Sequence, residues 1–514
     1  MDSFLRLGHE GSPDPAKPAM HLNQDILLQI MMYLHRSDAS RLSRTCRTLL
    51  QAAPQHLFEA RLGTGGWPIM VELSEPRQFT SFFMFIFRRH LGCLRYLQVL
   101  KLSPVGKWRR VPRLAQLLAE LFTKASALRA LYLDDCSIID FDERVRRAFT
   151  TMTGLRMIQI HAHTPDTPDW LEELQSPIAC IDVDFELSDE SGDRTDFVPV
   201  LEPFRTSLRA VKLKSIPWEE GPGIKFPLVF PNVASLEAEI FDLNWQLRTI
   251  YHCFPNVKEL STYSKDADGL VLDPEIEDIR LMNGRAQASG FWPSLRLLEG
   301  PLTELYMLAI QCAVDEVHTY TPFDTEVRYA RLTALIAATR PKMLELRLSK
   351  LAFDFDLSTL AQHLMPARER LNRLELAFGF HGQEYTDIAP GINKMLSALA
   401  KFALHSLDIY VYWGDSYLRK PSPGGQSMAD LDLAAMARHA LQCMPSLRYT
   451  VVHGEEPLRR IVYEARGGPT NARLPVELEP GCAGWADFET STRAHALGPG
   501  SADWFVGCPE YWNS

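Results

Sequence analysis

The chain has 514 residues, more than one compact core usually supports, so we expect an extended or multi-domain body. Its formal net charge of −10 argues against a general binder of nucleic acid or of anionic membranes, because either partner requires a basic field on the protein. Nine cysteines are scattered singly without a Cys-x-x-Cys pair, which favours buried thiols in a cytoplasmic or nuclear protein over a disulfide frame or a zinc site.

Residues 1–20 read MDSFLRLGHEGSPDPAKPAM, and we expect them to be disordered. No basic region leads into a long apolar stretch there, so we predict no secretory signal. The densest apolar run of the chain, FTSFFMFIF at 79–87, is far too short to cross a bilayer. The sequence therefore predicts no membrane segment.

Residues 21–66 are predicted to form a compact set of short helices. Ile26, Ile30 and Leu34 recur on one face of the first helix, and a second helical region follows at 37–53. This set carries more apolar surface than so few residues can bury alone. We therefore expect it to need a partner.

The segment resembles an F-box, the motif that docks its protein onto the Skp adaptor of cullin-RING ubiquitin ligases. The match runs through Leu22, Asp25-Ile26-Leu27, Ile30, Tyr33-Leu34, Asp38, Leu42-Ser43, Thr45-Cys46-Arg47 and Leu50. The resemblance implies adaptor contacts by Leu22, Ile26, Leu27, Ile30, Leu34, Leu42 and Cys46. The segment departs from the family at Asn23, where proline is usual, and at Thr48-Leu49, where tryptophan is common; both departures put the adaptor affinity in doubt. The alternative is a helical cap for a repeat array.

Residues 67–93 are predicted to be a helical linker. A helix over 79–97 would fix the first segment against the body that follows, whereas the alternative is a floppy tether. The aromatic density of SFFMFIF favours a packed joint, because so many rings in solvent would be an aggregation hazard.

Residues 94–454 carry a degenerate repeat. Its fullest copy, LRALYLDDCSI at 128–138, matches the leucine-rich unit L-x-x-L-x-L-x-x-C-x-L, in which alternate leucines point inward from a strand. Looser copies recur about every 29 residues, enough for a strand and a helix, and one of them is assigned to Met343, Leu346 and Leu348. We therefore predict an α/β fold, an irregular right-handed leucine-rich-repeat solenoid with a parallel sheet on its concave face.

A second phrase is expected at the junctions between units. FPNV occurs at 230–233 and at 254–257, and WPSL and MPSL follow at 292–295 and 444–447. The proline ends the preceding helix and the small polar residue suits a turn, so the phrase predicts helix, stop, turn and strand. The alternative is a doubly wound α/β domain, which would typically need a glycine-rich ligand loop; no G-x-G-x-x-G or P-loop phrase occurs.

Strand residues between the inward aliphatic positions are expected to point into the hollow of the solenoid. Acids outnumber lysine and arginine among them, which favours a basic or hydrogen-bonding protein segment as the ligand, with tyrosines as anchors. The alternative is a merely solvated face. The candidate target-binding residues are Tyr132, Asp134, Asp182, Asp184, Glu237, Glu239, Tyr320 and Tyr410.

No motif points to catalysis, a metal or a cofactor. His161-x-His163 near Asp166 lacks a third ligand at a recognisable spacing, and the acidic stretch 181–196 lacks the ligand pattern of a calcium loop. G-x-S-x-G, H-E-x-x-H and kinase signatures are absent from the sequence. We therefore expect a non-catalytic protein that takes no cofactor.

Residues 455–514 are predicted to form a C-terminal hairpin and tail. RRIVYEAR at 459–466 and ARLPVELE at 472–479 alternate around a glycine-rich turn. Such a hairpin would cover the exposed edge of the last repeat strand.

An F-box followed by leucine-rich repeats is itself a known family arrangement, and its divergent fungal members resemble this chain. The resemblance implies a substrate-recognition subunit of an SCF-type, cullin-RING ubiquitin ligase, which acts in ubiquitin-dependent protein degradation. Its partners would be a Skp-type adaptor, a cullin held through that adaptor, and a protein substrate, but neither nucleic acid nor a membrane. The main alternative is a binding scaffold outside ubiquitin ligases. An enzyme would require a deep pocket with converging titratable groups.

Overall fold

The structure is a computed structural model that describes only part of the chain. The predictions for residues 1–20, for the strand at 472–479 and for His163 fall outside that part. The described residues are 24–33, 41–42, 45, 49, 70–89, 91–103, 113–162, 170–185, 198–214, 228–239, 247–263, 273–288, 290–322, 326–349, 357–380, 389–413, 431–454 and 459–464.

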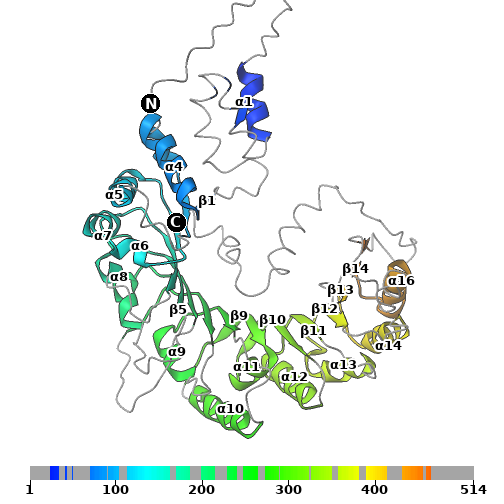
Figure 1. The fold of residues 1–514 in the computed structure, drawn as a ribbon. Helices are drawn as coiled ribbons and strands as arrows, with labels where there is room; N and C mark the ends of the chain where they lie inside the picture. Colours follow the sequence, from blue (N-terminus) through cyan, green and yellow to red (C-terminus); the bar gives the residue numbers. More distant parts are fainter. Residues whose placement is uncertain are drawn as a thin grey trace, which may run out of the picture.

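One curved sheet runs through the described body. Its strands follow one another in chain order from β1 (Met70–Leu73) to β15 (Arg459–Glu464). Strands β1 to β14 pair in parallel, whereas β15 pairs antiparallel to β14 (Tyr449–Gly454). Figure 1 shows the strands along the inside of a C-shaped body and the helices along its outside. Because the strand order never reverses, the doubly wound alternative is wrong and a solenoid-like α/β fold is confirmed.

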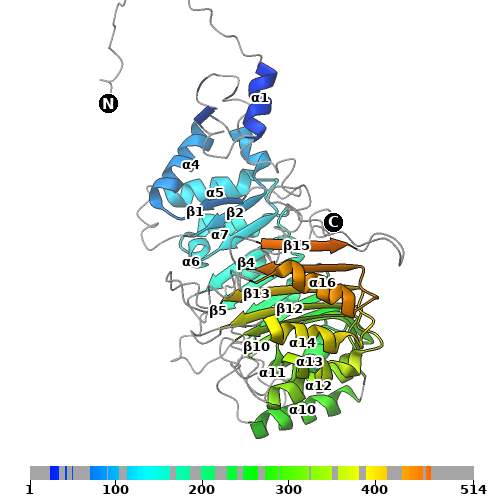
Figure 2. The same cartoon turned by 90° about the vertical axis from the view of Figure 1, so that its right-hand side faces the viewer.

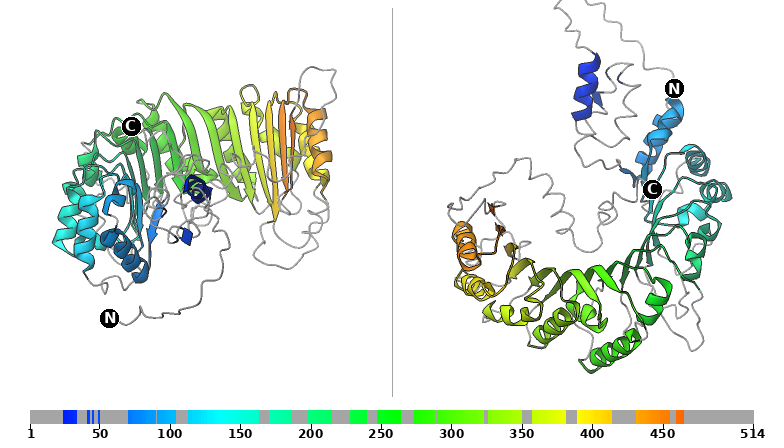
Figure 3. Two further views of the ribbon diagram at one scale, coloured as in Figure 1. Left: turned by 90° about the horizontal axis from the view of Figure 1, so that it is seen from above. Right: turned by 180° about the vertical axis from the view of Figure 1, so that it is seen from behind.

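Strands and helices alternate along most of the chain, and Figure 3 shows the strands side by side across the inner face. The remaining strands are β2 (Val99–Leu102), β3 (Ala130–Leu133), β4 (Met157–Ala162), β5 (Cys180–Phe185), β6 (Ala210–Lys214), β7 (Ser235–Glu239), β8 (Glu259–Tyr263), β9 (Ser294–Pro301), β10 (Ala313–Pro322), β11 (Met343–Ser349), β12 (Arg373–Phe380) and β13 (Ser406–Trp413). The helices are α1 (Gln24–Tyr33), α4 (Pro76–Arg89), α5 (Leu114–Lys124), α6 (Ser137–Asp140), α7 (Glu143–Thr150), α8 (Trp170–Glu173), α9 (Leu247–Cys253), α10 (Asp273–Gln287), α11 (Leu302–Met307), α12 (Glu326–Thr339), α13 (Leu357–His363), α14 (Ala389–Leu399) and α16 (Leu433–Cys443), with 3₁₀ turns η1 (Leu91–Tyr96), η3 (Val198–Phe204) and η4 (Met365–Ala367).

The unit at 128–138 folds as its spacing predicts. Leu131 and Leu133 are buried on the helix side of β3, whereas Tyr132 belongs to a separate cluster on the other face. Cys136 is buried in the turn that follows the strand, where burial and the nearby carboxylates of Asp135 and Asp140 raise its pKa to about 11. Equivalent aliphatic side chains join the same core from unit to unit. The repeat spacing therefore builds one continuous core between the sheet and the helices.

The FPNV phrase does more than end a helix. Helix α9 ends at Cys253, and the Phe254 ring stacks on the Phe230 ring of the preceding copy at a centroid distance of 5.4 Å. Asn256 Nδ2 donates to the Pro231 carbonyl at 2.8 Å, and Asn232 Nδ2 repeats the contact one turn earlier. The phrase thus links successive turns through stacked rings and a short asparagine ladder.

The linker prediction is partly wrong. Residues 70–73 form β1, which pairs with β2, so the sheet begins before residue 94. Four residues without a complete leucine pattern gave no repeat signal. The aromatic segment forms α4, and Phe79, Phe83 and Ile86 enter the main core. The aromatic segment therefore packs against the solenoid body, whereas its connection to residues 21–66 runs through residues outside the described part.

The first strand of the predicted C-terminal hairpin forms and pairs with β14, whereas its predicted pairing with residues 472–479 lies outside the described residues. Residues 459–464 form β15, which pairs antiparallel with β14 in register from Tyr449↔Glu464 to Gly454↔Arg459. A strand that follows its neighbour after a short connection can pair directly with that neighbour, as β15 does with β14. The predicted covering of the last parallel edge is nevertheless what β15 provides.

Candidate functional site

A row of mostly polar side chains crosses the concave face at one position of each strand. We call it the middle row, and strand register places its members side by side. The middle row consists of Glu72, Lys101, Tyr132, Gln159, Asp182, Lys212, Glu237, Ser261, Glu299, His318, Glu345, Glu375, Asp408 and Val451. The row follows directly from the repeat, since the residue between two inward leucines must face the hollow.

The predicted target-binding residues divide between this row and the next. Tyr132, Asp182 and Glu237 lie in the middle row, and all three are buried by their surroundings. Asp184, Tyr320 and Tyr410 lie two positions further along their strands, in an outer row, and are half-buried; Asp134 follows β3 and is also half-buried. Glu239 is paired with Tyr263 on β8, and its side chain falls outside the description. The middle-row residues thus face the hollow as predicted, but their burial was not predicted.

Glu345 lies in the middle row, although the predicted repeat copy did not place it there. Strand register aligns Leu344 and Leu346 with Leu374 and Leu376, so the residue between them, Glu345, faces the hollow. The predicted copy of Met343, Leu346 and Leu348 is therefore shifted by two positions. Leu348 adds a third inward leucine to the strand, and only pairing with β12 fixes the register.

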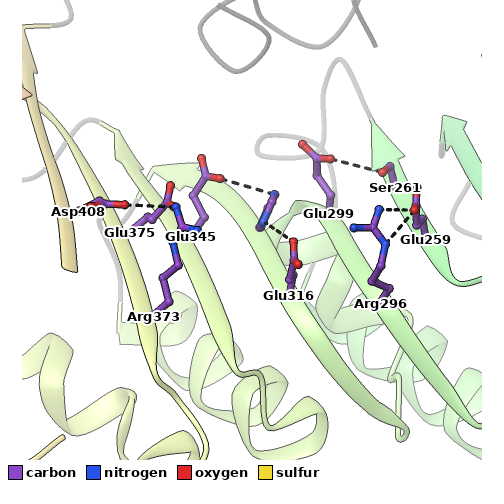
Figure 4. Close-up of polar contacts among 10 residues, drawn as sticks. Glu259, Ser261, Arg296, Glu299, Glu316, Glu345, Arg373, Glu375 and Asp408 are labelled. Atoms are coloured by element: carbon purple, nitrogen blue, oxygen red, sulfur yellow. Dashed lines mark hydrogen bonds and ion pairs between the residues drawn. The ribbon is translucent and has the colours of Figure 1, made fainter. Parts of the chain in front are cut away.

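Carboxylates outnumber cations on the middle row from β9 to β13 (Figure 4). Glu299, Glu345, Glu375 and Asp408 occupy the row there. Arg373, from a neighbouring position, contacts Glu375 and Asp408, the latter at 3.4 Å. His318 Nδ1 lies 3.6 Å from Glu345 Oε2, and Arg347 Nε lies 2.7 Å from its Oε1.

The pKa values of two carboxyl groups in this half are raised above their ordinary values. Burial, together with the Glu237 and Glu345 carboxylates, raises the pKa of Glu299 to about 7. Burial and Asp408 likewise raise the pKa of Glu375 to about 7. Burial is the larger cause of both shifts, and the neighbouring carboxylates add to it.

Ion pairs are more evenly matched from β5 to β7. Lys212 Nζ lies 2.6 Å from Glu237 Oε1, and both side chains are buried. Lys214 Nζ lies 3.7 Å from Asp184 Oδ2, which also faces the Nδ1 atom of His161 at 3.4 Å. Burial would lower the pKa of Lys212, but Glu237 and Asp182 raise it above its ordinary value.

Aromatic rings occupy the outer row beside these charges. Lys214 lies over the ring of Tyr263, with Nζ 6.0 Å from its centroid. Tyr410 stacks on His453 at 4.2 Å with an angle of 4° between the ring planes. Flat, amphipathic side chains next to charged ones are the composition of protein recognition surfaces.

The predicted adaptor-binding residues lie in and beyond α1, which Figure 2 shows past the α4 end of the sheet. Ile26 is 46% exposed and Ile30 is 40% exposed, one turn apart, while Leu27 is half-buried on the same helix. Leu42 is half-buried. Leu22, Leu34 and Cys46 lie outside the described residues.

One cluster on the helical side combines nucleophilic groups. Ser397 Oγ on α14 lies 3.1 Å from His439 Nε2 on α16, and Cys443 Sγ lies 3.5 Å from the same nitrogen. The other polar contacts of this imidazole are the Asn393 carbonyl and Cys443 Sγ, which lies 3.9 Å from Nδ1, so among the described residues no carboxylate orients it as in a catalytic triad. The cluster joins two helices.

Three further features hold for the described residues. They contain no group of three or more histidine, cysteine or acidic side chains placed to hold a metal ion. None of their helices has the length and apolarity needed to span a membrane. Their cysteines are free thiols, at positions 136, 180, 253, 312 and 443.

Comparison with known proteins gives no family assignment. No protein-family model matches the chain, and no curated protein matches its sequence.

Proposed function

We propose that the chain is the substrate-recognition subunit of an SCF-type ubiquitin ligase. In this proposal the segment 21–66 is an F-box that binds a Skp-type adaptor, and the solenoid is a leucine-rich-repeat body that holds a target protein. The chain itself performs no chemistry. It shortens the path between a target lysine and the ubiquitin thioester by holding both in one assembly.

The observation that carries the proposal is the exposed apolar stripe of α1. Ile26 and Ile30 lie one turn apart on a short helix, and each exposes about two-fifths of its surface to solvent. Both are positions that the F-box resemblance assigns to adaptor contact. A short helix gains stability mainly by burying such a stripe, so a partner surface is its natural complement.

The joint between the two modules suits this role. Phe79 and Phe83 of α4 lie in the main core, and η1 leads directly into β2. A joint that packs through aromatic rings holds its orientation better than a Gly- or Ser-rich linker would. A defined distance between adaptor and target is what proximity catalysis needs.

The concave face suits a protein ligand. It presents a continuous row of hydrogen-bonding side chains across β1 to β13, flanked by tyrosines such as Tyr320 and Tyr410. A row of this kind can contact an extended or helical segment along its length.

Charge placed in the α1 stripe tests the proposal. The variant Ile30→Asp should abolish co-purification of a Skp-type adaptor, because an aspartate would be buried without a partner at the interface. Gln29→Asp is the matched control, since Gln29 is the exposed neighbour on the same helix. It should retain adaptor binding.

Circular dichroism and thermal unfolding of both variants should match the parent protein, because the solenoid core does not include Ile30. Adaptor binding by Ile30→Asp at parental affinity would refute the docking assignment. Failure of the parent chain to bind any adaptor would instead favour a scaffold outside ubiquitin ligases.

A further inference from the structure

Among the acids of β5 to β7 whose side chains are described, Asp182 alone forms no ion pair within 4.0 Å, and Lys212 and Lys214 attract it only from further away. Its side chain is 3% exposed, and its Oδ1 atom accepts no hydrogen bond from the described residues. Lys212, which is paired with Asp182 in the strand register, forms its close ion pair with Glu237 on the next strand. Burial of a carboxylate oxygen that accepts no hydrogen bond lowers the stability of a protein, so the presence of Asp182 at this position needs an explanation.

Gln159 presents a second acceptor beside it. Strand register pairs Gln159 with Asp182, and its side chain is 7% exposed. Its Nε2 donates to His161 Nε2 at 2.9 Å, while its Oε1 accepts no hydrogen bond from the described residues. In this arrangement the two acceptors on neighbouring strands cannot satisfy each other, and one added group that carries several donors would satisfy both.

The charge balance decides which group fits. The described side chains of β5 to β7 include three acids, Asp182, Asp184 and Glu237, but two lysines. Lys212 pairs with Glu237 and Lys214 with Asp184, so the acids exceed the lysines by one, and no close ion pair forms at Asp182. Burial raises the pKa of Asp182 to about 6 although Lys212 and Lys214 oppose the shift. One positive charge with more than one N–H donor would complete the cluster.

We propose that Asp182 and Gln159 form a subsite for a single guanidinium group, the arginine side chain of a target segment. A guanidinium offers five donors in a planar fork and is more weakly hydrated than an ammonium, so it suits two adjacent buried acceptors. Because both acceptor atoms are closed to solvent, arginine entry requires neighbouring side chains to shift. The long, flexible Lys212 and Lys214 are the ones best able to do so.

The subsite deepens the target-binding half of the proposed function and is independent of the adaptor-binding half. The probe is the peptide acetyl-Gly-Gly-Arg-Gly-Gly-amide, titrated into the full chain by calorimetry. Peptides with citrulline or lysine in place of arginine are the matched controls. Arginine should bind about tenfold or more tightly than citrulline, which has the same shape without the charge, and lysine should fall between them.

Variants locate the binding. Asp182→Asn should weaken the arginine peptide about tenfold or more, and Gln159→Leu should weaken it less, because it removes a neutral acceptor. Asp315→Asn makes the same charge change outside the row, beside Lys342 and Arg370, and should leave binding unchanged. Equal binding of arginine and citrulline, or full binding by Asp182→Asn, would overturn the subsite.

Stability of the free protein separates a ligand site from a structural one. If Asp182 awaits a cation, Asp182→Asn removes a buried uncompensated charge and should raise the melting temperature by about 2 °C. If Gln159 turns its amide to donate to Asp182, or an ordered water serves both oxygens, the substitution would lower it. A lower melting temperature together with unchanged peptide binding would assign the pair to structure alone.

Solution pH gives a second readout. The groups that face this pair are His161, Asp134, Asp184, Lys212, Lys214 and Glu237. Asp184 raises the pKa of His161, and a protonated His161 would turn the Gln159 oxygen toward its own Nε2–H. Both that protonation and protonation of Asp182 remove acceptors, so arginine should bind more tightly at pH 8 than at pH 5.5. The opposite order would contradict the subsite.

Adaptor co-purification keeps the two hypotheses apart. Asp182→Asn should retain the adaptor, because Asp182 lies on β5 and not on α1. Loss of arginine binding with adaptor binding intact supports the subsite, whereas failure of the Ile30→Asp experiment bears only on the docking segment.

Discussion

The two halves of the concave face share the same strand geometry but differ in how their charges are balanced. From β5 to β7, buried lysines stand between acids, and Lys212 meets Glu237 at 2.6 Å. From β9 to β13, carboxylates occupy adjacent strands, and Arg373 and Arg347 reach them from neighbouring positions. The first half balances its charges mainly by pairing, with Asp182 as the exception, whereas in the second half the pKa values of Glu299 and Glu375 are both raised to about 7.

The difference teaches that a repeat fixes where a side chain points but not how its charge is balanced. Each strand contributes one middle-row residue, and its electrostatic neighbours come from the strands before and after it. Acids placed on adjacent strands therefore raise each other's pKa, whereas a lysine between two acids forms a buried pair.

Removal of the buried lysine should have the largest effect. Lys212→Met leaves Glu237 buried without its paired cation, and we expect it to cost about 3–5 kcal/mol in the free energy of unfolding. The midpoint of urea unfolding measures this loss. Lys342→Met is the control, since its pair with Asp315 is half-exposed and should cost about 1 kcal/mol or less. Equal losses in the two variants would show that burial adds nothing to the stabilising effect of the Lys212–Glu237 pair.

The raised pKa of Glu299, in the β9–β13 half, predicts that the stability of the protein depends on pH. The pKa of Glu299 is about 7 in the folded chain and near 4.5 as a free side chain, so the folded state binds the extra proton between these values. Its contribution is therefore favourable at low pH and is lost as pH rises through 7. Glu299→Gln should be more stable than the parent by about 2 kcal/mol at pH 8 and nearly equal at pH 4.

Urea unfolding of the parent and the variant at both pH values checks this prediction. Glu326→Gln, which removes an exposed carboxylate on α12, is the matched control and should behave as the parent at both. A parent protein more stable than Glu299→Gln at pH 8 would mean that a cation holds the Glu299 carboxylate ionised.

The repeat pattern predicted the inward face well because its signal is local. Leu128, Leu131 and Leu133 sit three and two positions apart, and that spacing alone places them in the core of one unit. The order of strands and the outward helices follow from repetition of the same signal. The aromatic joint was also predictable, since rings as dense as those near Phe83 need a core.

Features that depend on neighbouring strands could not be predicted. The place of Glu345 in the middle row required the register between β11 and β12, and the burial of Asp182 required side chains from β4 and β6. Strand β1 lacked a full repeat and showed itself only through pairing with β2. The direction of each side chain in the candidate site depends on the local repeat pattern, whereas its charge state depends on side chains from neighbouring strands. The sequence therefore predicted which residues face the hollow but not their charge states.

The smallest expected effect comes from the arginine that bridges the second half. Arg373 is about half-exposed and contacts Glu375 and Asp408, so Arg373→Met should cost about 1 kcal/mol at pH 8, far less than Lys212→Met. The loss should shrink at pH 5.5, where the raised pKa of Glu375 leaves that acid protonated and in less need of a cation. Urea unfolding at both pH values measures it. A loss as large as that of Lys212→Met, or one that grows at low pH, would show that the second half also depends on buried pairing and not on bound protons.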